Sequence, residues 1–308
     1  MRLLIAIIAI FFGLNTTGQA RDIFVDNLFG DDRNDGASAR LTEFGGGPCR
    51  SITKALRVAE KGDHIIIAKN PEPYRESITL QAGRNSGIVG QPFIIEGNGA
   101  VLDGRQAIPE IAWEHFQHDV FRFRPNRMSF QLLYLKDTPA VRREVKEDER
   151  RLPELKPREW CLFDRHIYFN AGPSRIPINY DLTHTVLPVG ITLYEINHVE
   201  IRDLTIQGFQ IDGVNAHDSV FDTSVVGLTC RGNGRAGISV GGASRLRMEA
   251  CLVGNNGTAQ VRTEGRSITR VVNCTLLDNT GPAVKREGGE VFVEPVAKTV
   301  QLPNSPIR

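Results

Sequence analysis

Two short charged motifs stand at matching positions near the end of the chain, and their side chains are of types that can do chemistry. Arg262-x-Glu264 and Lys285-x-Glu287 are separated by 23 residues, and His217 lies upstream in the same pattern. Two carboxylates about 5 Å apart are used by retaining glycoside hydrolases. A base with nearby cations suits β-elimination from a sugar acid, because the base removes the proton next to the carboxylate and the cations neutralise the developing charge.

Each chemistry gives these side chains different roles. In β-elimination, His217, Arg262 or Lys285 would supply the base or the neutralising cation, and Glu264 and Glu287 could hold Ca²⁺. In hydrolysis, the two glutamates would form the carboxylate pair. A basic residue stands two positions from each glutamate, however, and a neighbouring cation keeps a carboxylate ionised. A general acid must hold a proton, so the arrangement suits hydrolysis poorly.

A structural interpretation of the same charges competes with both chemistries, and we favour it slightly. Ion-paired charges on the last two repeats protect the end of a stacked β-structure from pairing with another chain. His217 is then an exposed bystander. Asp212, Asp218 and Asp222 lie where turns are expected, and turn formation explains them.

The elements that must position these residues form a repeat over residues 190–295. Corresponding residues recur every 23 or 24 positions, a period typical of solenoids. Apolar and polar residues alternate within each repeat, and the apolar columns are rich in β-branched residues, which predicts strands. We therefore expect an all-β, single-stranded, right-handed parallel β-helix. Its inward columns are Ile191, Val214, Ile238, Val261 and Val284; Leu204, Leu228, Cys251 and Cys274; and Ile206, Cys230, Val253 and Leu276.

Residues between the first inward columns should form one outward strip along the axis. We expect it to contain Tyr194, Asn215, His217, Ser239, Arg262, Glu264, Lys285 and Glu287. Tyr194, Asn215 and Ser239 are the predicted substrate-binding residues. Ser239, together with Gly241 and Gly242, should leave a shallow gap for a sugar ring. A separate column of Asn233, Asn256 and Asn279 is interpreted as a turn ladder in which φ is positive.

The N-terminus predicts export. One basic residue, an apolar run from Leu3 to Leu14 and a polar end at Gly18-Gln19-Ala20 are typical of a signal peptide cleaved after residue 20. The mature chain, residues 21–308, is then secreted or periplasmic. The apolar run is too short for a confident membrane span, so no span is expected. A formal net charge of +1 argues against bulk nucleic-acid binding, and we expect a monomer.

Residues 21–80 should begin the solenoid. Ser51 is a predicted N-cap for a short amphipathic helix that is closed by Gly62 and covers the open end of the coils. The preceding Gly/Asp-rich loop is not an EF-hand, because Arg33 and Thr42 occupy positions that need ligands. Of the five cysteines, the three in the repeats should be buried, and pairing of Cys49 with Cys161 is left open.

The period breaks between residues 107 and 185, which we interpret as an irregular insertion. Its charge run, residues 140–159, is expected to be a solvated loop or short helix rather than a binding patch. Its aromatic residues are expected to form a small core in preference to stacking on sugars. These aromatic residues are Trp113, Phe116, Trp160 and Tyr168.

Several segments together resemble secreted β-helix proteins of the pectate-lyase-like superfamily. They are a strand ending VDN, a Pro-Cys-Arg-Ser-Ile helix, the run KGDHIIIAKNPEPYRESITL, the later repeats, and the insertion segments QLLYLKDTPAVRREV and REWCLFDRHIYFNAG. The resemblance implies a β-helix whose parallel sheet forms a groove for polysaccharide. It carries over no catalytic residue, since neither a polygalacturonase-type Asp-Asp pair with Gly-His-Gly nor a pectate lyase signature is present.

Two functions remain open at this point. The first is an exported enzyme acting on a polysaccharide, which we expect to be acidic, with a lyase-like reaction ahead of a glycosidase-like one. The alternative is a non-catalytic glycan-binding or cell-envelope structural module. The absence of a recognised catalytic signature favours the module, whereas the exposed strip of mixed charge favours the enzyme.

Overall fold

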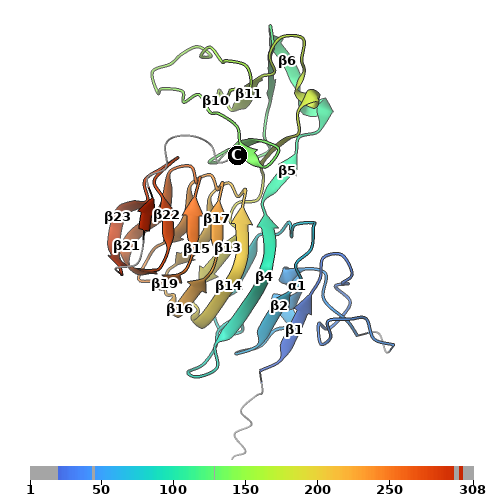
Figure 1. The fold of residues 1–308 in the computed structure, drawn as a ribbon, viewed down its shortest axis with the longest axis vertical. Coiled ribbons are helices and arrows are strands. Elements are labelled where there is room, and N and C mark those ends of the chain that lie inside the picture. Colours follow the sequence, from blue (N-terminus) through green and yellow to red (C-terminus); the bar gives the residue numbers. More distant parts are fainter. Residues whose placement is uncertain (1–19, 44–45, 128, 295–297, 301–308) are drawn as a thin grey trace, which may run out of the picture.

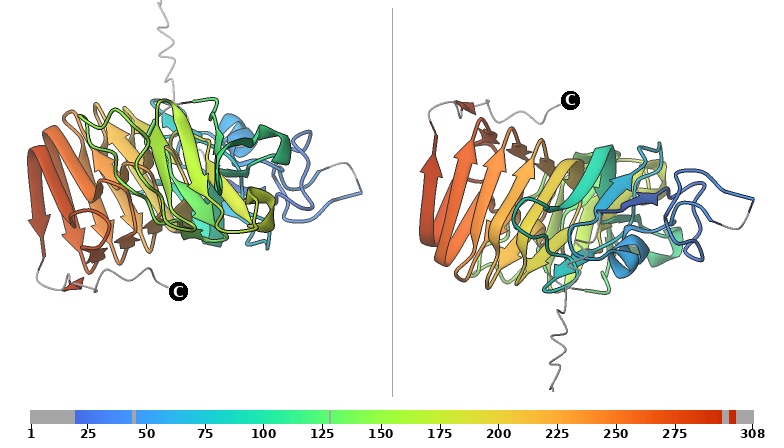
Figure 2. Two further views of the ribbon diagram at one scale, coloured as in Figure 1. Left: turned by 90° about the horizontal axis from the view of Figure 1, so that it is seen from above. Right: turned by 90° about the horizontal axis from the view of Figure 1, so that it is seen from below.

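Parallel strands wind into coils that stack along one axis, and an insertion projects from one side of the stack (Figure 1, Figure 2). The computed structural model describes residues 20–43, 46–127, 129–294 and 298–300. The predicted signal peptide, apart from Ala20, lies outside the described residues. Within them, no helix is long and apolar enough to cross a membrane.

One face of the coil stack carries the residues singled out above. Its strands pair in parallel in the order β3, β13, β15, β18, β21 and β23. Their bounds are β3 Ile78–Gln81, β13 Ile191–Tyr194, β15 Asp212–His217, β18 Ala236–Val240, β21 Ala259–Val272 and β23 Val284–Val293. The long strands β21 and β23 bend and continue into a second face. We call this first sheet the strip face.

Two further parallel runs complete each coil. The second face contains β1 (Asp22–Val25), β2 (His64–Ile67), the first part of β4 (Phe93–Asp103), the first part of β14 (Asn197–Gln207), β16 (Phe221–Val226) and β19 (Arg245–Glu249). The third contains the ends of β4 and β14, then β17 (Thr229–Arg231), β20 (Leu252–Gly254), β22 (Thr275–Leu277) and β24 (Lys298–Val300). The predicted parallel β-helix is therefore present.

The predicted inward columns are confirmed residue by residue. Ile191 pairs with Val214, Val214 with Ile238, and the series continues through Val261 to Val284. Val261 is fully buried. The second and third columns are likewise in register and buried in the same core. Burial of such aliphatic columns drives folding, because each side chain leaves water and packs on its equivalents above and below.

The asparagine column is a ladder, but its backbone differs from the prediction. Asn233 and Asn256 are fully buried, and Asn233 Nδ2 donates to Asn256 Oδ1 at 3.0 Å. Gln260 then stands between Asn256 and Asn279, accepting from Asn256 Nδ2 at 2.9 Å and donating to Asn279 Oδ1 at 3.4 Å. The positive φ angles lie one residue earlier, at Gly232 and Asn255. The asparagines therefore fill the interior of the turn, and the preceding residue makes the bend.

The first coil includes the predicted helix, α1, at Ile52–Val58. Ser51 caps it by accepting from the Lys54 N–H, and Glu76 accepts from the N–H groups of Ile52 and Thr53. The helix ends at Val58 with Ala59 as its C-cap, before the predicted Gly62. Gly62 lies in the following turn and has a φ of 75°. It packs against β1, β2 and β3 through its apolar side.

Residues 105–185 differ from the irregular insertion that the sequence suggested. They form two small four-stranded antiparallel sheets, in the orders β10-β11-β7-β6 and β5-β12-β8-β9. The bounds are β5 Arg105–Ala107, β6 Glu114–Gln117, β7 Val120–Phe123, β8 Leu133–Leu135, β9 Thr138–Pro139, β10 Trp160–Phe163, β11 His166–Asn170 and β12 Leu182–Thr185. Short 3-10 helices occupy Glu110–Ala112 and Pro177–Asn179. The charge run between β9 and β10 is a loop, as expected.

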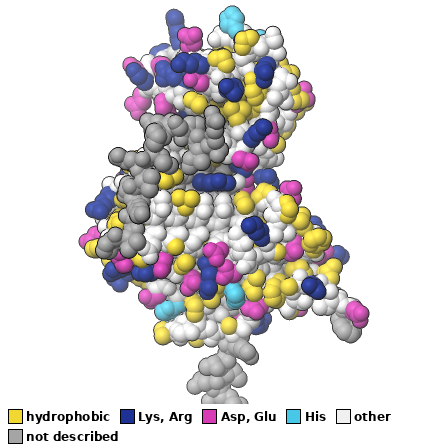
Figure 3. All heavy atoms as spheres, viewed as in Figure 1, with side chains coloured by type: hydrophobic (Ala, Val, Ile, Leu, Met, Phe, Trp, Pro, Cys, Tyr) yellow, Lys and Arg dark blue, Asp and Glu magenta, His cyan; other side chains and the backbone are white. Residues whose placement is uncertain are grey.

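The insertion has its own cores. Trp160 and Tyr168 are buried, which confirms the core interpretation for these two, whereas Phe116 remains 39% exposed. Charged side chains of both signs are interspersed over the outside of the insertion (Figure 3). Cys161 belongs to an insertion core and Cys49 to the coil core, and both are free thiols, so the open possibility of a disulfide between them is wrong.

Candidate functional site

The predicted strip exists as two adjacent outward columns on the strip face. Thr192 pairs with Asn215, and the column continues through Ser239 and Arg262 to Lys285. In the second column, Tyr194 pairs with His217 and Glu264 with Glu287. Equivalent residues on neighbouring coils are separated by roughly 4.8 Å. The eight predicted residues therefore lie in two adjacent columns on the outward side of one sheet.

At the last two coils, the charged members of the strip neutralise one another. Arg262 Nη2 lies 2.7 Å from Glu264 Oε2 and also contacts Glu287 Oε2 on the next coil. Lys285 Nζ lies 2.8 Å from Glu287 Oε1. The Arg262 side chain is only 13% exposed and contacts both glutamates. The four charges therefore sum to zero and offer no free cation.

These ion pairs favour the ionised form of the Glu287 carboxyl group. Its hydrogen bond from Lys285, and then that from Arg262, hold its pKa below the usual value. A carboxylate with a lowered pKa is ionised at neutral pH, which confirms for Glu287 that it is poorly suited to act as a general acid. Among the described strands, β23 pairs only with β21, so this charged ladder also lines the outer edge of the strip face, in accord with edge protection.

The predicted gap at the middle of the strip is filled. Ser239 is only 1% exposed, so its expected exposure is wrong. Arg262 Nη1 reaches over it, 3.4 Å from Ser239 Oγ. A Cβ added at Gly241 would lie 2.9 Å from Glu264 Oε1, which places that carboxylate over the glycine. The long side chains of the next coil therefore fold back across the small residues.

Asn215 is tied to a buried ion pair. Its Nδ2 donates to Asp212 Oδ2 at 3.0 Å. Asp212 has no exposed surface and accepts two bonds from Arg235, at 2.5 and 3.0 Å. Burial raises the pKa of Asp212, while the bonds from Arg235 favour its charged form. Asp212 is buried and cannot reach a ligand, so its ion pair with Arg235 has a structural role. Of Asp212 and Asn215, only Asn215 is available at the surface.

Tyr194 and His217 form an aromatic pair that remains open to solvent. Their ring centroids are 5.1 Å apart with an interplanar angle of 52°. His217 is about one-third exposed, at 37% of its side chain, and its Nδ1 lies 3.0 Å from Asp218 Oδ2. When Nδ1 carries the proton, its N–H donates a hydrogen bond to Asp218 Oδ2, and Nε2 is left as a proton acceptor. The arrangement can therefore both stack on a ring and orient a base.

Sequence reasoning missed two carboxylates beside this pair. Glu195 and Asp218 follow Tyr194 and His217, and both have positive φ, at 51° and 68°. The corresponding positions on the next three coils are glycines, which adopt such angles without strain: Gly242, Gly265 and Gly288. The charge of Glu195 raises the pKa of Tyr194. The signal was available in the repeat, as two acidic residues in a column otherwise filled by glycine. Asp218 was interpreted as part of a turn, and Glu195 was not singled out.

Metal binding finds no geometric support within the described part of the chain. No group of three or more His, Cys, Asp or Glu side chains there is arranged to hold a metal ion. Glu264 and Glu287, the predicted Ca²⁺ ligands, are instead bound to Arg262 and Lys285.

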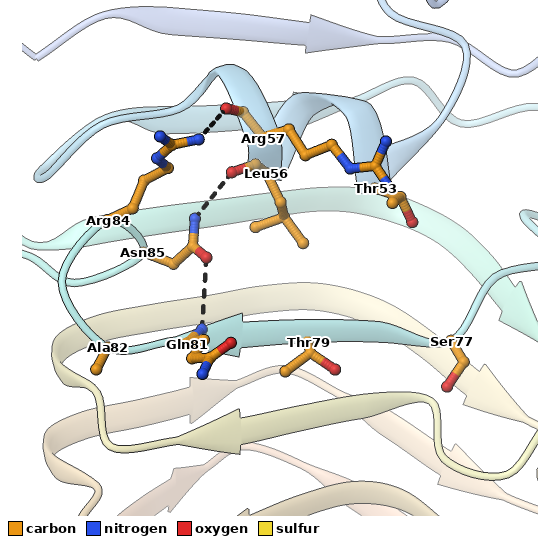
Figure 4. A pocket seen from close by; sticks show the side chains of 9 residues that line it. All are labelled: Thr53, Leu56, Arg57, Ser77, Thr79, Gln81, Ala82, Arg84 and Asn85. Atoms are coloured by element: carbon orange, nitrogen blue, oxygen red, sulfur yellow. Dashed lines mark hydrogen bonds between the residues drawn. The ribbon is translucent and has the colours of Figure 1, made fainter.

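A cavity of about 450 Å³ lies at the other end of the strip face, between α1 and the outward side of β3 (Figure 4). Gln81 on its floor pairs with Tyr194, and Thr79 pairs with Thr192, so the cavity continues both columns of the strip by one coil. Its lining residues are Thr53, Leu56, Arg57, Ser77, Thr79, Gln81, Ala82, Arg84 and Asn85.

Comparison with known proteins supports the fold. Residues 184–298 match the family model described as a right handed beta helix region. No sequence among curated proteins matches the chain. Solved structures that align with it include a glycoside hydrolase, with 13% identity over 87% of this chain and 67% of that one and a TM-score of 0.48. A complex of XylC with xylose aligns at 13% identity over 89% and 70%, with a TM-score of 0.43.

Pectate lyase Pel9A aligns at 10% identity over 84% of this chain and 54% of that one, with a TM-score of 0.42. The evidence for the architecture is the continuous parallel register of the coils and the family match over residues 184–298. On these grounds the chain contains a right-handed parallel β-helix, as the sequence predicted.

Proposed function

We propose that this protein is exported and binds a polysaccharide along the strip face. The observation that carries the proposal is the Tyr194–His217 pair, with two aromatic rings on neighbouring coils and polar side chains in the same columns on either side. Aromatic rings combine an apolar face with polar edges, which suits the C–H faces and hydroxyl groups of a sugar. The polymer would run along the solenoid axis, and the helix α1 would close the first coil.

The charged ladder has a structural role in this proposal. Arg262 and Lys285 bind Glu287, so neither cation is available to a sugar carboxylate without breaking an existing pair. Glu264 and Glu287 then serve to neutralise these cations and to protect the last coil. The protein would act as a monomer in the secreted or periplasmic space.

Titration calorimetry tests the binding proposal. The mature protein is titrated with xylo-oligosaccharides, oligogalacturonates, alginate oligomers and glycosaminoglycan fragments, each with and without Ca²⁺. Binding to at least one series, lost in Tyr194→Ala with an unchanged unfolding midpoint, is the expected result. A ring contact of about 1.4 kcal/mol corresponds to roughly tenfold in Kd. Failure of the unsubstituted protein to bind any series would overturn the proposal.

A catalytic role is a second candidate, and the His217–Asp218 contact favours it. With Nδ1 held by Asp218, Nε2 could remove the proton next to a uronate carboxylate. The glycosidic C–O bond on the neighbouring carbon would break, and the leaving oxygen would take up a proton from the imidazolium or from water. The products are one unsaturated and one reducing chain end. Ultraviolet absorbance of the unsaturated product detects this reaction. A lyase should lose activity in His217→Gln and retain binding, whereas absence of product from every bound polymer leaves the binding module.

A further inference from the structure

We propose that the cavity between α1 and β3 is a subsite for the carboxylate of an acidic sugar, and that it makes the polysaccharide ligand a polyuronate. The inference rests on the proposed function, because it extends the same strip. It assigns the recognition of the sugar acid to other cations than Arg262 and Lys285, which the sequence suggested as candidates to neutralise its charge.

Register places the cavity in line with the aromatic pair. Gln81 lies beside Tyr194, and Tyr194 lies beside His217, on three successive strands of one sheet. A chain stacked on the two rings and continuing toward the N-terminal end would therefore enter the cavity. A volume of about 450 Å³ is within the range of roughly 300–1,000 Å³ typical of small-ligand sites.

The cavity holds cations that no carboxylate neutralises. Arg57 from α1 and Arg84 from the loop after β3 are among its nine lining residues, none of which is acidic. Within the described part of the chain, the Arg57 guanidinium has no ion-pair or hydrogen-bond partner. Arg84 Nη1 donates to the backbone carbonyl of Arg57 at 2.5 Å, which is a neutral acceptor (Figure 4). A guanidinium has five N–H groups, so most of those on Arg84 remain available.

The acidic side chain that contacts α1 from just before β3 is already engaged in hydrogen bonds. Glu76 accepts from the backbone N–H groups of Ile52 and Thr53 and from Thr53 Oγ1 at 2.6 Å. These bonds hold its charge at the N-terminal end of the helix, whereas Arg57 lies in the last turn. The cavity consequently differs from the ladder at Arg262, where each cation has a glutamate partner.

Asn85 links α1 to β3 by hydrogen bonds, beside the apolar packing of the helix on the core. Its Nδ2 donates to Leu56 O at 3.1 Å, and its Oδ1 accepts from the Gln81 N–H at 3.4 Å. Asn85 is 7% exposed and joins the helix to the free edge of the strand. The positive charges of Arg57 and Arg84 are not required for this link. Arginine is well suited to bind a carboxylate through two parallel N–H···O bonds, so a uronate is the ligand that these cations fit best.

The test compares charge-changing variants by calorimetry. Arg57→Gln combined with Arg84→Gln removes both charges and keeps hydrogen-bond donors. The matched control is Arg124→Gln with Arg150→Gln, two exposed arginines of the insertion that have no ion-pair partner among the described residues. The probes are an oligogalacturonate and a xylo-oligosaccharide of the same length, each measured at two salt concentrations.

The cavity variant should bind the oligogalacturonate at least roughly tenfold more weakly, with a flatter salt dependence. The control should retain binding within about threefold. The variant Arg57→Lys with Arg84→Lys keeps the charge but cannot form two parallel N–H···O bonds to one carboxylate, so its affinity should fall between those of the control and the glutamine variant. An equal unfolding midpoint in all variants shows that a loss of binding is not caused by a loss of folding.

If the oligogalacturonate binds the cavity variant and the unsubstituted protein equally, or if the neutral oligomer binds as tightly as the acidic one, the polyuronate subsite is wrong and the glycan-binding proposal stands. If neither oligomer binds the unsubstituted protein, both ideas fail for these sugars.

Discussion

Arg262 binds Glu287 across two neighbouring coils, and this contact joins the two charged motifs of the predicted strip. Lys285 shares the same glutamate, and together the two cations lower its pKa. The strip is thus divided into an ion-paired end on the last two coils and an open aromatic end at Tyr194 and His217. Binding is expected at the aromatic end, and stabilisation of the last coil at the ion-paired end.

Removing the two cations should restore ordinary titration of Glu287. In Arg262→Gln combined with Lys285→Gln, the pKa of this carboxyl is expected to rise toward its usual value of 4.5. Because the folded pKa is lowered, the pairs stabilise the native state above the usual pKa, and this contribution is lost as pH falls through the folded pKa. Carbon NMR of the side-chain carboxyl, with Arg124→Gln as the control, measures the shift. Identical titration of Glu287 in both variants would refute the ladder.

Val261 should be among the least replaceable residues of the coils. It is fully buried between Ile238 and Val284, so Val261→Asp places an unpaired charge in the apolar core. We expect a loss of roughly 3–5 kcal/mol of unfolding free energy, measured by denaturant titration. Arg124→Ala, at an exposed position, is expected to change it by about 0.5 kcal/mol or less. Comparable effects of the two substitutions would mean that the assigned register is wrong.

His184 should make the insertion sensitive to mild acid. Burial lowers its pKa from 6.5 to about 4, and its ring packs edge-on against Phe123. Between these two values the unfolded chain binds a proton that the native state does not, so stability falls as pH is lowered through that window. Across this whole pH window, the free energy of unfolding is expected to fall by on the order of 3 kcal/mol. His184→Phe should remove this part of the pH dependence in denaturant melts at pH 7 and pH 4, while His118→Asn, at an exposed position, should keep it.

Export is testable on the protein itself. Cleavage after Ala20 predicts that N-terminal sequencing of material from the periplasm or medium begins at Arg21. In the structure, the Arg21 backbone N–H donates to Asp63 Oδ1 at 3.1 Å, and the Arg21 side chain pairs with Asp63 at 2.6 Å. The mature N-terminus would therefore be anchored to the first coil. Recovery of exported protein that still carries Met1 would show that this cleavage does not occur.

The repeat made the coil register predictable. A column such as Ile238, Val261 and Val284 recurs at a fixed spacing, and a parallel β-helix places equivalent residues above one another. The insertion was not predictable in this way. Its strand β12 pairs with β5 and β8, at separations set by tertiary contacts rather than by any period in the sequence.

Positions within the strip were predicted better than their environment. The alternation of inward and outward residues places Ser239 on the outward side of β18, as expected. It does not show that the long side chain of Arg262 folds back and covers it. Similarly, the predicted helix α1 is present, but the cavity beside β3 depends on how the helix packs, which local sequence does not specify.

A crystal structure with a bound oligogalacturonate tests the central claim most directly, because it locates the sugar on the molecule. The account predicts sugar rings over Tyr194 and His217, a chain running along the solenoid axis, and a carboxylate beside Arg57 in the cavity between α1 and β3. Sugar density confined to the antiparallel sheets of the insertion, with the strip face empty, would contradict it.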